Sequence, residues 1–184
     1  MRSIAVLLLV ACFVTTSANA QSGITIEPFA GISIPTDSDF SDGFKTGMAL
    51  GGRFGYAVTD NIDVTAAFSF NRFGADIEGF GKTQGEVDFD WDIIGVRVGG
   101  RYSSTPSGSL GFRAMAEAGM ASQKVKSDFG SSDSETDPAV AVGVGGQYYF
   151  TPTASVAIGP TFNMIFAEES YHFLDIVASV IFGF

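Results

Sequence analysis

The last thirteen residues of the chain alternate between two kinds of side chain up to the final position. Because successive side chains of a β-strand point to opposite faces, one parity of this segment would project from a single face of a sheet. That parity carries mostly apolar groups and ends on an aromatic ring. A soluble protein has little reason to end on a Phe-Gly-Phe that faces water. The members of this face are His172, Leu174, Ile176, Ala178, Val180, Phe182 and Phe184.

The same two-residue period recurs in seven earlier segments, and we find no competing helical stretch. Each segment has about the length of a tilted membrane-spanning strand, ~9–11 residues. The connections alternate between short turns (59–61, 103–109, 151–153) and longer polar segments (36–45, 72–85, 123–137), with a short fourth loop near 168–170. This arrangement predicts an all-β fold, an eight-stranded antiparallel up-and-down transmembrane β-barrel. The seven segments are 24–34, 50–58, 62–71, 94–102, 110–120, 140–150 and 156–164.

The N-terminus has the features of a secretory signal. Arg2 precedes an apolar stretch from Ile4 to Val14, and Ala18 and Ala20 have the spacing of a signal-peptidase site. We therefore expect residues 1–20 to be removed and residues 21–184 to form the barrel domain. A lipoprotein signal with Cys12 as the lipidated residue is the competing interpretation. The apolar stretch continues past Cys12, which disfavours it.

Cleavage after Ala20 leaves an acidic chain without cysteine. Arg2 is the only charged residue before Gln21, so the formal net charge changes from −10 to −11. This charge argues against nucleic acid as a partner. Loss of Cys12 excludes a disulfide, a thiolate metal site and a cysteine nucleophile. Glycine and charged residues interrupt every apolar run after residue 20, so a membrane crossing would require a closed barrel.

Charged side chains indicate which face of the barrel points outward. Six of them lie on the less apolar parity, and an arginine near the middle of a bilayer costs roughly 2–4 kcal/mol. In a membrane barrel they must point into the lumen. A secreted lipocalin-like ligand binder has the same alternation with its apolar face inside. The terminal Phe184 and the Phe, Ile and Val of the other face favour the membrane. The six residues are Glu27, Arg53, Arg97, Arg101, Arg113 and Glu117.

We expect these six residues to form a compensated polar network that largely plugs the lumen. Arg97 and Glu117 lie diagonally across one predicted hairpin, and Glu27 and Arg53 lie on neighbouring strands. A buried charge is tolerable when it is paired. Inward-facing glycines would leave room for the arginines. The alternative is an ion gate in a narrow channel. The glycines are Gly31, Gly51, Gly55, Gly95, Gly99, Gly143 and Gly145.

Three other features shape the expected barrel. Aromatic residues gather near the short turns, as in an interfacial girdle: Phe54, Tyr56, Tyr102, Phe112, Tyr148, Phe150, Phe182 and Phe184. The apolar parity changes near Ile93, which predicts either a β-bulge there or a segment 87–92 that stands above the membrane. Pro28 and Pro160 fall inside predicted strands, and we expect a bulge or a local break at each.

The sequence offers little for catalysis. His172 is the only histidine, and its parity points it toward lipid or the outer rim. A Ser/His/acid site needs the base within hydrogen-bond reach of its nucleophile. Ser170 and Glu169 are near His172 in sequence only. We expect no enzyme activity, no cofactor and no metal ligands. The acidic loop segments 37–39 and 133–137 are expected to be solvated.

Segment 144–156, a strand, a tight turn and a second strand, resembles the small outer-membrane β-barrel family of OmpA-like and OmpX-like proteins. The resemblance covers the whole chain after residue 20 and includes no peptidoglycan-binding domain after the barrel. It implies outer-membrane lipid and lipopolysaccharide as surroundings, a monomer, termini in the periplasm and long loops outside. The final Val180, Phe182 and Phe184 resemble the signal read by the barrel-assembly machinery. Family members include structural proteins, adhesins, narrow pores and lipid A-modifying enzymes, so the fold does not decide the function.

Overall fold

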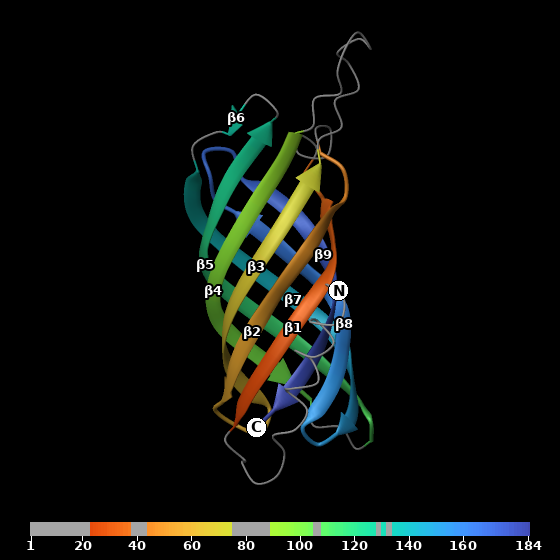
Figure 1. Ribbon diagram of the computed structural model, residues 1–184. Coiled ribbons are helices and arrows are strands. Elements are labelled where there is room, and N and C mark those ends of the chain that lie inside the picture. The colour runs from red at the N-terminus through yellow and green to blue at the C-terminus, as the bar shows by residue number, and fades with distance from the viewer. Residues whose placement is uncertain (1–22, 38–43, 75–88, 105–107, 128–129, 132–133) are drawn as a thin grey trace, which may run out of the picture.

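The computed structural model describes residues 23–37, 44–74, 89–104, 108–127, 130–131 and 134–184. Each long strand pairs antiparallel with its neighbours in the chain, and the last pairs with the first, so the sheet closes into a barrel (Figure 1). The predicted eight-stranded antiparallel β-barrel is confirmed. Its strands are β1 (Ile24–Pro35), β2 (Gly47–Ala57), β3 (Ile62–Gly74), β4 (Phe89–Ser103), β5 (Leu110–Ser127), β7 (Glu135–Thr151), β8 (Ala154–Ile165) and β9 (Tyr171–Gly183), with a two-residue β6 (Gly130–Ser131) beside the end of β5.

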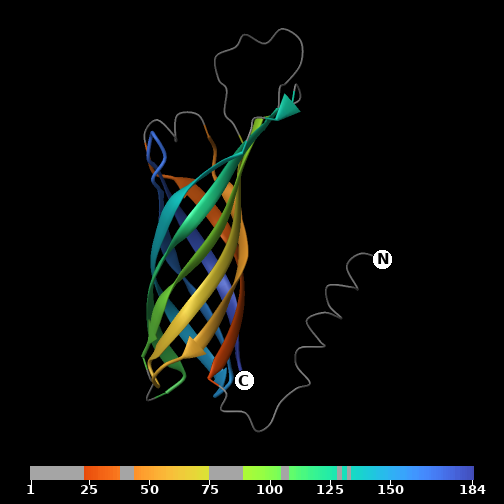
Figure 2. The same cartoon turned by 90° about the vertical axis from the view of Figure 1, so that its left-hand side faces the viewer.

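The two ends of the barrel differ in their connections. Residues 58–61, 104–109 and 152–153 join strands at the end where β1 begins and β9 stops, which we call the turn end. The connections after β1, β3, β5 and β8 lie at the opposite, loop end. β4 and β5 are longer than β1 and β2 and extend beyond the rest of the rim (Figure 2). Within the described residues, no helix is both long and apolar enough to cross a membrane.

Large apolar side chains cover the outer wall. Val98 and Ile158 are each 62% exposed, as expected from the parity of their strands. Contiguous exposed apolar surface of this kind marks contact with a membrane or a partner. Near the turn end the ring centroids of Tyr148 and Phe150 lie 5.2 Å apart. Six rings of the expected girdle are exposed on the outer wall: Phe54, Tyr56, Tyr102, Phe112, Tyr148 and Phe150. Phe182 and Phe184 are half-buried beside them.

The interior of the barrel is apolar near the loop end, and we call this apolar region the cap. Trp91 is its centre, with its ring centroid 5.1 Å from that of Phe44 and 4.9 Å from that of Tyr171. The centroids of Phe73 and Phe173 lie 5.5 Å apart in an edge-on arrangement. Fully buried aromatic pairs of this geometry stabilise a core beyond their buried area. The buried members are Phe73, Trp91, Ile93, Ala121, Ala139, Ile165 and Phe173.

The cap explains the change of parity before Ile94. The expected β-bulge is wrong, because β4 keeps one register with β3 and with β5 through Ile93 and Ile94. Trp91 and Ile93 face inward and are buried in the cap, whereas Ile94 faces outward. The inward residues of β4 are therefore apolar at its loop end, and the strand continues there without irregularity. Residues 87–88 of the expected irregular segment lie outside the described residues.

The two strand prolines interrupt pairing on one side only. Between β1 and β9 the pairing skips Glu27 and Pro28, yet the register is the same before and after them. Pro28 still aligns with Gly52 of β2. Between β7 and β8 the pairing is skipped beside Pro160, while that residue aligns with Ile176 of β9. Each proline lacks the N–H of a ladder bond, so the local break is observed without a bulge.

Strand residues replace parts of two predicted loops, 72–85 and 123–137. β5 continues to Ser127 and β7 begins at Glu135, so most of the segment expected to be a loop from 123 to 137 is strand. β3 likewise continues to Gly74, and residues 75–88 lie outside the described part of the chain. Strand segments beyond a membrane need no apolar face, so their polar sequences gave no strand signal. The short turns at 59–61 and 151–153 and the short fourth loop lie between strands as predicted.

Candidate functional site

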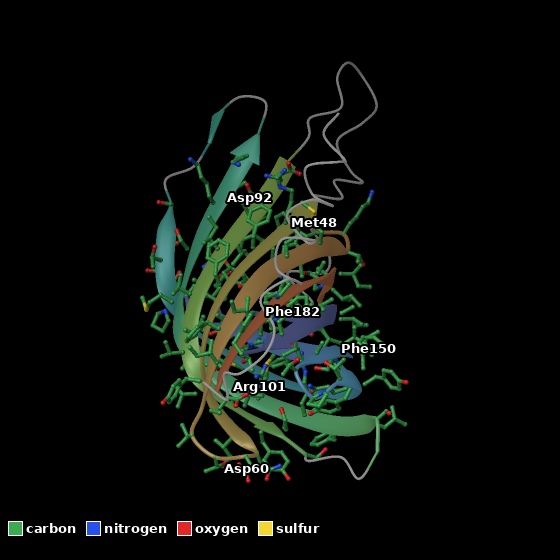
Figure 3. All side chains as sticks on the ribbon, turned by 60° about the horizontal axis from the view of Figure 1, so that its bottom comes forward. Met48, Asp60, Asp92, Arg101, Phe150 and Phe182 are labelled. Carbon is green, nitrogen blue, oxygen red and sulfur yellow. The ribbon has the colours of Figure 1, made fainter. Side chains whose placement is uncertain are left out.

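Charged and polar side chains fill the lumen between the cap and the turn end. Inward positions of β3 show the order along the barrel: Asp63, Thr65 and Asn71 precede Phe73 of the cap. Each of the three polar residues belongs to one group of interacting side chains, and we name the groups the Glu27, Glu117 and Asp175 levels after their central carboxylates. Figure 3 shows Phe150 projecting away from the wall near the turn end.

In the Glu27 level, one carboxylate binds three arginine side chains. Arg101 donates from Nη1 to Glu27 Oε2 at 2.7 Å, and Arg113 donates from Nη1 to Oε1 at 2.5 Å. Arg53 Nη1 lies 3.1 Å from the same Oε1. Arg101 also donates from Nε to Asp63 Oδ2 at 2.8 Å. The Glu27 side chain has no solvent exposure. Charge-assisted bonds from several donors offset the cost of burying a carboxylate.

The Glu117 level joins β2, β3, β4 and β5 across the lumen. Arg53 binds the carboxylate with two nitrogens, Nε to Oε1 at 2.6 Å and Nη2 to Oε2 at 3.3 Å. Thr65 donates from Oγ1 to Oε1 at 2.9 Å. Arg97 is paired most loosely, with its Nε 3.9 Å from Glu117 Oε2 and no hydrogen-bond partner for that Nε among the described residues. The buried Ser69 hydroxyl is likewise without a described partner.

The Asp175 level uses neutral donors. Ser33 donates from Oγ to Asp175 Oδ1 at 2.6 Å, and Asn71 donates from Nδ2 to the same oxygen at 3.0 Å. Asn163 donates from Nδ2 to Oδ2 at 2.9 Å. Four strands therefore converge on one carboxylate beneath the cap. Three neutral hydrogen bonds satisfy its oxygens without an ion pair.

Glycine provides space for the arginine side chains at two positions. A Cβ on Gly55 would lie 2.3 Å from Thr25 Oγ1 and 3.3 Å from Arg101 Nη2. A Cβ on Gly95 would lie 2.7 Å from Ser69 Oγ and 3.1 Å from Arg97 Nη1. Both approaches are closer than ordinary van der Waals contact. These glycines are therefore part of the site, since any larger residue would displace the buried polar groups.

All six charged residues named from the sequence are buried in the lumen, and all six meet in the Glu27 and Glu117 levels. Sequence reasoning missed Asp175 entirely, because the final strand was interpreted from its outward parity alone. Asp63 had the correct parity and was not selected. With these two carboxylates the lumen holds four arginines and four acidic groups. The same inward parity marks the neutral partners that were missed: Thr25, Ser33, Thr65, Asn71 and Asn163.

His172 lies at the outer rim of the barrel. Its side-chain contacts among the described residues are with an aspartate and a phenylalanine, not with a nucleophilic side chain. Its Nδ1 is 3.5 Å from Asp37 Oδ2, and its ring stacks on Phe162 at a centroid distance of 5.8 Å. Among the described residues, no group of three or more His, Cys, Asp or Glu side chains is arranged to hold a metal ion. Val180, Phe182 and Phe184 lie at the turn end of β9 and just after it. Cys12, Ala18 and Ala20 lie outside the described residues.

Comparisons with known proteins agree with this architecture. The sequence profile described as "Outer membrane protein beta-barrel domain" matches residues 4–184. No curated protein matches the chain significantly. Among solved structures, Neisserial surface protein A is 18% identical with a TM-score of 0.67, covering 90% of this chain and 100% of that one. The attachment invasion locus protein Ail of Yersinia pestis, in complex with a heparin analogue, is 17% identical with a TM-score of 0.52, covering 86% and 97%.

A third similar structure is a major outer membrane protein from Thermus thermophilus. It is 9% identical with a TM-score of 0.54, covering 86% of this chain and 98% of that one. At these identities the structural likenesses establish the fold and leave the ligands of each relative as properties of that relative.

Proposed function

Because the chain belongs to the outer membrane protein β-barrel domain family, we propose that it is a non-enzymatic surface or structural protein with a closed lumen. Its work would then be done by the outer wall and the loop end. The outer-membrane location follows from the family. The plugged lumen and the acidic extracellular loops go beyond what the family implies and belong to the proposal.

The observation that supports closure is the stacking of three polar levels beneath an apolar cap. Glu27 has no exposed side-chain surface, and Arg53, Arg101 and Arg113 are each no more than 5% exposed. Phe73 and Phe173 close the lumen above the Asp175 level. An eight-stranded barrel encloses only enough space for side chains to fill. The only histidine of the chain, His172, lies outside the lumen at the rim, with its Nδ1 3.5 Å from Asp37 Oδ2.

The topology supports an orientation for the barrel. Bacterial outer-membrane barrels have short periplasmic turns and longer outer loops. By that rule the turn end, with both barrel termini, is periplasmic, and the loop end is extracellular. The proposed surroundings are outer-membrane lipid and lipopolysaccharide, and the proposed state is a monomer. Val180, Phe182 and Phe184 are proposed as the segment read by the barrel-assembly machinery.

A narrow channel for ions or small solutes is the second candidate, and the environment of Arg97 favours it. The Nε of Arg97 and the Ser69 hydroxyl have no hydrogen-bond partner among the described residues. The 3.9 Å separation from Glu117 makes Arg97 the arginine that is held least tightly. Movement of this one side chain would widen the Glu117 level while Arg53 kept its bidentate bonds.

Planar-bilayer recordings of the refolded protein distinguish these two functions. We expect no steady conductance for the wild-type chain and none for Arg72→Met, a control variant outside the lumen. A steady, large wild-type conductance would contradict the closed lumen. Conductance that appears only in Arg97→Met would show that this side chain alone blocks a path.

Heat-modifiable gel migration tests the membrane barrel itself. Folded outer-membrane barrels resist denaturing detergent until they are boiled and then change mobility. We expect such a shift for residues 21–184 refolded in detergent. A monomer that is soluble in plain buffer and shows no shift would contradict the membrane barrel and favour a secreted ligand binder.

A further inference from the structure

The described cations fall into two groups that occupy different parts of the molecule. Arg53, Arg97, Arg101 and Arg113 are buried in the lumen. The other described cations all lie at the loop end, where Lys45 donates its backbone N–H to Gly74 and the rest are on β3 and β5. The turn end has none among the described residues. The second group comprises Lys45, Arg72, Lys124 and Lys126.

Three of these cations form one outward-facing cluster with two carboxylates, which we call the rim cluster. Arg72, Asp92 and Lys124 align across β3, β4 and β5, and Lys126 aligns with Asp90 one outward position higher. Their parity is that of Ile94, which faces away from the lumen. Three cations and two carboxylates give the cluster a formal charge of +1. The rim cluster is thus Arg72, Asp90, Asp92, Lys124 and Lys126.

The contacts within the rim cluster hold Arg72 in place and leave donors accessible. Arg72 donates from Nε to Asp92 Oδ1 at 2.6 Å and from Nη2 to Oδ2 at 2.9 Å. Its guanidinium also lies 5.5 Å from the centre of the Phe70 ring. Lys126 Nζ donates to Asp92 Oδ2 at 2.6 Å. The side chains of Arg72 and Lys126 remain 37% and 48% exposed.

The rim cluster lies directly above the apolar outer wall. One outward position closer to the turn end, Phe70 aligns with Ile94; two positions closer, Phe68 aligns with Val96 and Met120. Phe68, Ile94, Val96 and Met120 are all exposed. If the apolar wall lies in hydrocarbon, the cations are at the height of the lipid headgroups. Guanidinium and ammonium groups bind phosphate oxygens through charge-assisted hydrogen bonds.

The opposite side of the rim has the reverse charge. Glu168 and Glu169 are exposed in the connection between β8 and β9, across the barrel from β4. Nearer the cluster, Glu135 of β7 is exposed and aligns with Gln123 of β5. These carboxylates would repel a phosphate. An anionic headgroup should therefore be held on one side of the barrel, over β3, β4 and β5.

We propose that the rim cluster is a lateral binding site for the phosphate groups of a phosphorylated glycolipid in the surrounding leaflet, the chemistry of the lipid A headgroup. Lys124, Lys126 and Nη1 of Arg72, which lies 3.9 Å from Asp90 Oδ2, donate to phosphate, and Asp92 orients Arg72. Acyl chains of the same lipid lie along Phe68, Val96 and Met120. This inference rests on the proposed outer-membrane orientation, and it adds a specific partner and a specific side of the barrel.

The test measures binding of lipid A to the refolded full barrel domain by native mass spectrometry in detergent. Lys124→Gln/Lys126→Gln removes two charges from the rim cluster and keeps the Arg72–Asp92 pair. Ala167→Glu/Ser170→Glu adds two negative charges in the connection between β8 and β9, across the barrel from β4, so it matches the change in net charge at a distant place. Both variants are first checked for the heat-dependent gel shift. A loss of that shift in the wild-type protein would contradict the proposed membrane barrel and not the rim cluster alone.

We expect diphosphoryl lipid A to bind the wild-type protein, and the lysine double variant to weaken binding about tenfold or more, since two charge-assisted bonds are lost. The acidic-side variant should stay within about twofold, because screening weakens charges that are more than a Debye length apart. Equal weakening by both variants would contradict a local site. Equal binding of dephosphorylated lipid A would contradict phosphate recognition.

Two competitors identify the source of the bound group. Millimolar inorganic phosphate should not displace lipid A, because the acyl chains add contacts with the wall. Full displacement would show a site for soluble anions and overturn the lipid assignment. Binding that disappears with a chelator of divalent cations would show an ion bridging Asp90 or Asp92 to the lipid, and would overturn direct recognition by the lysines.

Discussion

The lumen and the rim cluster combine arginine and carboxylate side chains in opposite surroundings. In the lumen, Glu27 is fully buried and its partners come from three other strands. In the rim cluster, Asp92 is also buried, but it is bound by residues of the two neighbouring strands whose side chains are substantially exposed. Buried pairs must be complete, because an uncompensated charge there is costly. Pairs whose cations stay in contact with water contribute less to stability, and those cations stay available to a ligand.

Glu27→Gln should have the largest effect and would test the buried side of this comparison. It removes the charge shared by Arg53, Arg101 and Arg113, and breaking a buried ion pair costs about 3–5 kcal/mol. We expect a loss of that size in the free energy of unfolding in urea, followed by the gel shift, because Trp91 reports only on the cap. Glu168→Gln, at the exposed loop end, is the matched control. An unchanged midpoint for Glu27→Gln would contradict the pairing.

Arg53→Ala tests the same region from the cationic side. Arg53 contacts both Glu27 and Glu117, so its removal uncouples two levels at once. We expect a loss of about 3 kcal/mol, at the lower end of the range for a buried pair because Arg101, Arg113 and Thr65 keep the carboxylates partly satisfied. Urea titration of the refolded variant provides the measurement. A stability equal to wild type would show that these contacts contribute nothing net.

Arg97→Met should have an intermediate effect. Because the Nε of Arg97 lies 3.9 Å from Glu117 and has no hydrogen-bond partner among the described residues, we expect a loss of roughly 1–2 kcal/mol, less than for a hydrogen-bonded buried pair. The same urea titration measures it. A loss as large as that of Glu27→Gln would show that Arg97 is held as firmly as the other arginines, and the narrow-channel alternative would lose its support.

Asp92→Asn should have the smallest effect, about 1 kcal/mol, because water can solvate the exposed Arg72 and Lys126 when the charge of the buried Asp92 is lost. High salt should reduce this difference, whereas the loss caused by Glu27→Gln should persist. The hydrogen bond from Arg72 lowers the pKa of Asp92, which lies beyond the lipid-facing part of β4. The contribution of this pair is therefore present above the ordinary carboxyl pKa and is lost as the pH falls through the lowered value. Salt-independent destabilisation would contradict the contrast with the lumen.

The sequence predicted whether a side chain points into or out of the barrel better than it predicted which side chains bind one another. The two-residue period assigns a face to each position of a strand regardless of its neighbours, which is why Glu27, Arg53 and Glu117 were placed inward. The partners across the lumen depend on the stagger of strands in a closed barrel. No local pattern states that Glu117 of β5 meets Arg53 of β2. Only neighbouring-strand or hairpin pairs, such as Glu27 with Arg53, were within reach of sequence reasoning.

The errors at the loop end have one physical origin, because the strands continue beyond the apolar wall. There the outward side chains are polar and the inward ones are apolar, which reverses the usual pattern. Trp91 and Ile93 of the cap were therefore interpreted as an irregularity, and the strand ends at Lys124 and Lys126 were interpreted as loop. Asp175 was missed for a different reason, because β9 was assigned from its apolar outward residues alone.

The position of Asp175 in the chain has a consequence for the order of events during folding. The Glu27 and Glu117 levels draw all their charged members from β1 to β5, so the ion network is encoded before residue 128. The Ser33–Asp175 bond spans 142 positions and crosses the seam where β9 meets β1. Closing this seam and completing the Asp175 level are therefore one event. A nascent chain can gather its charges early, but it finishes its interior only when its last strand arrives.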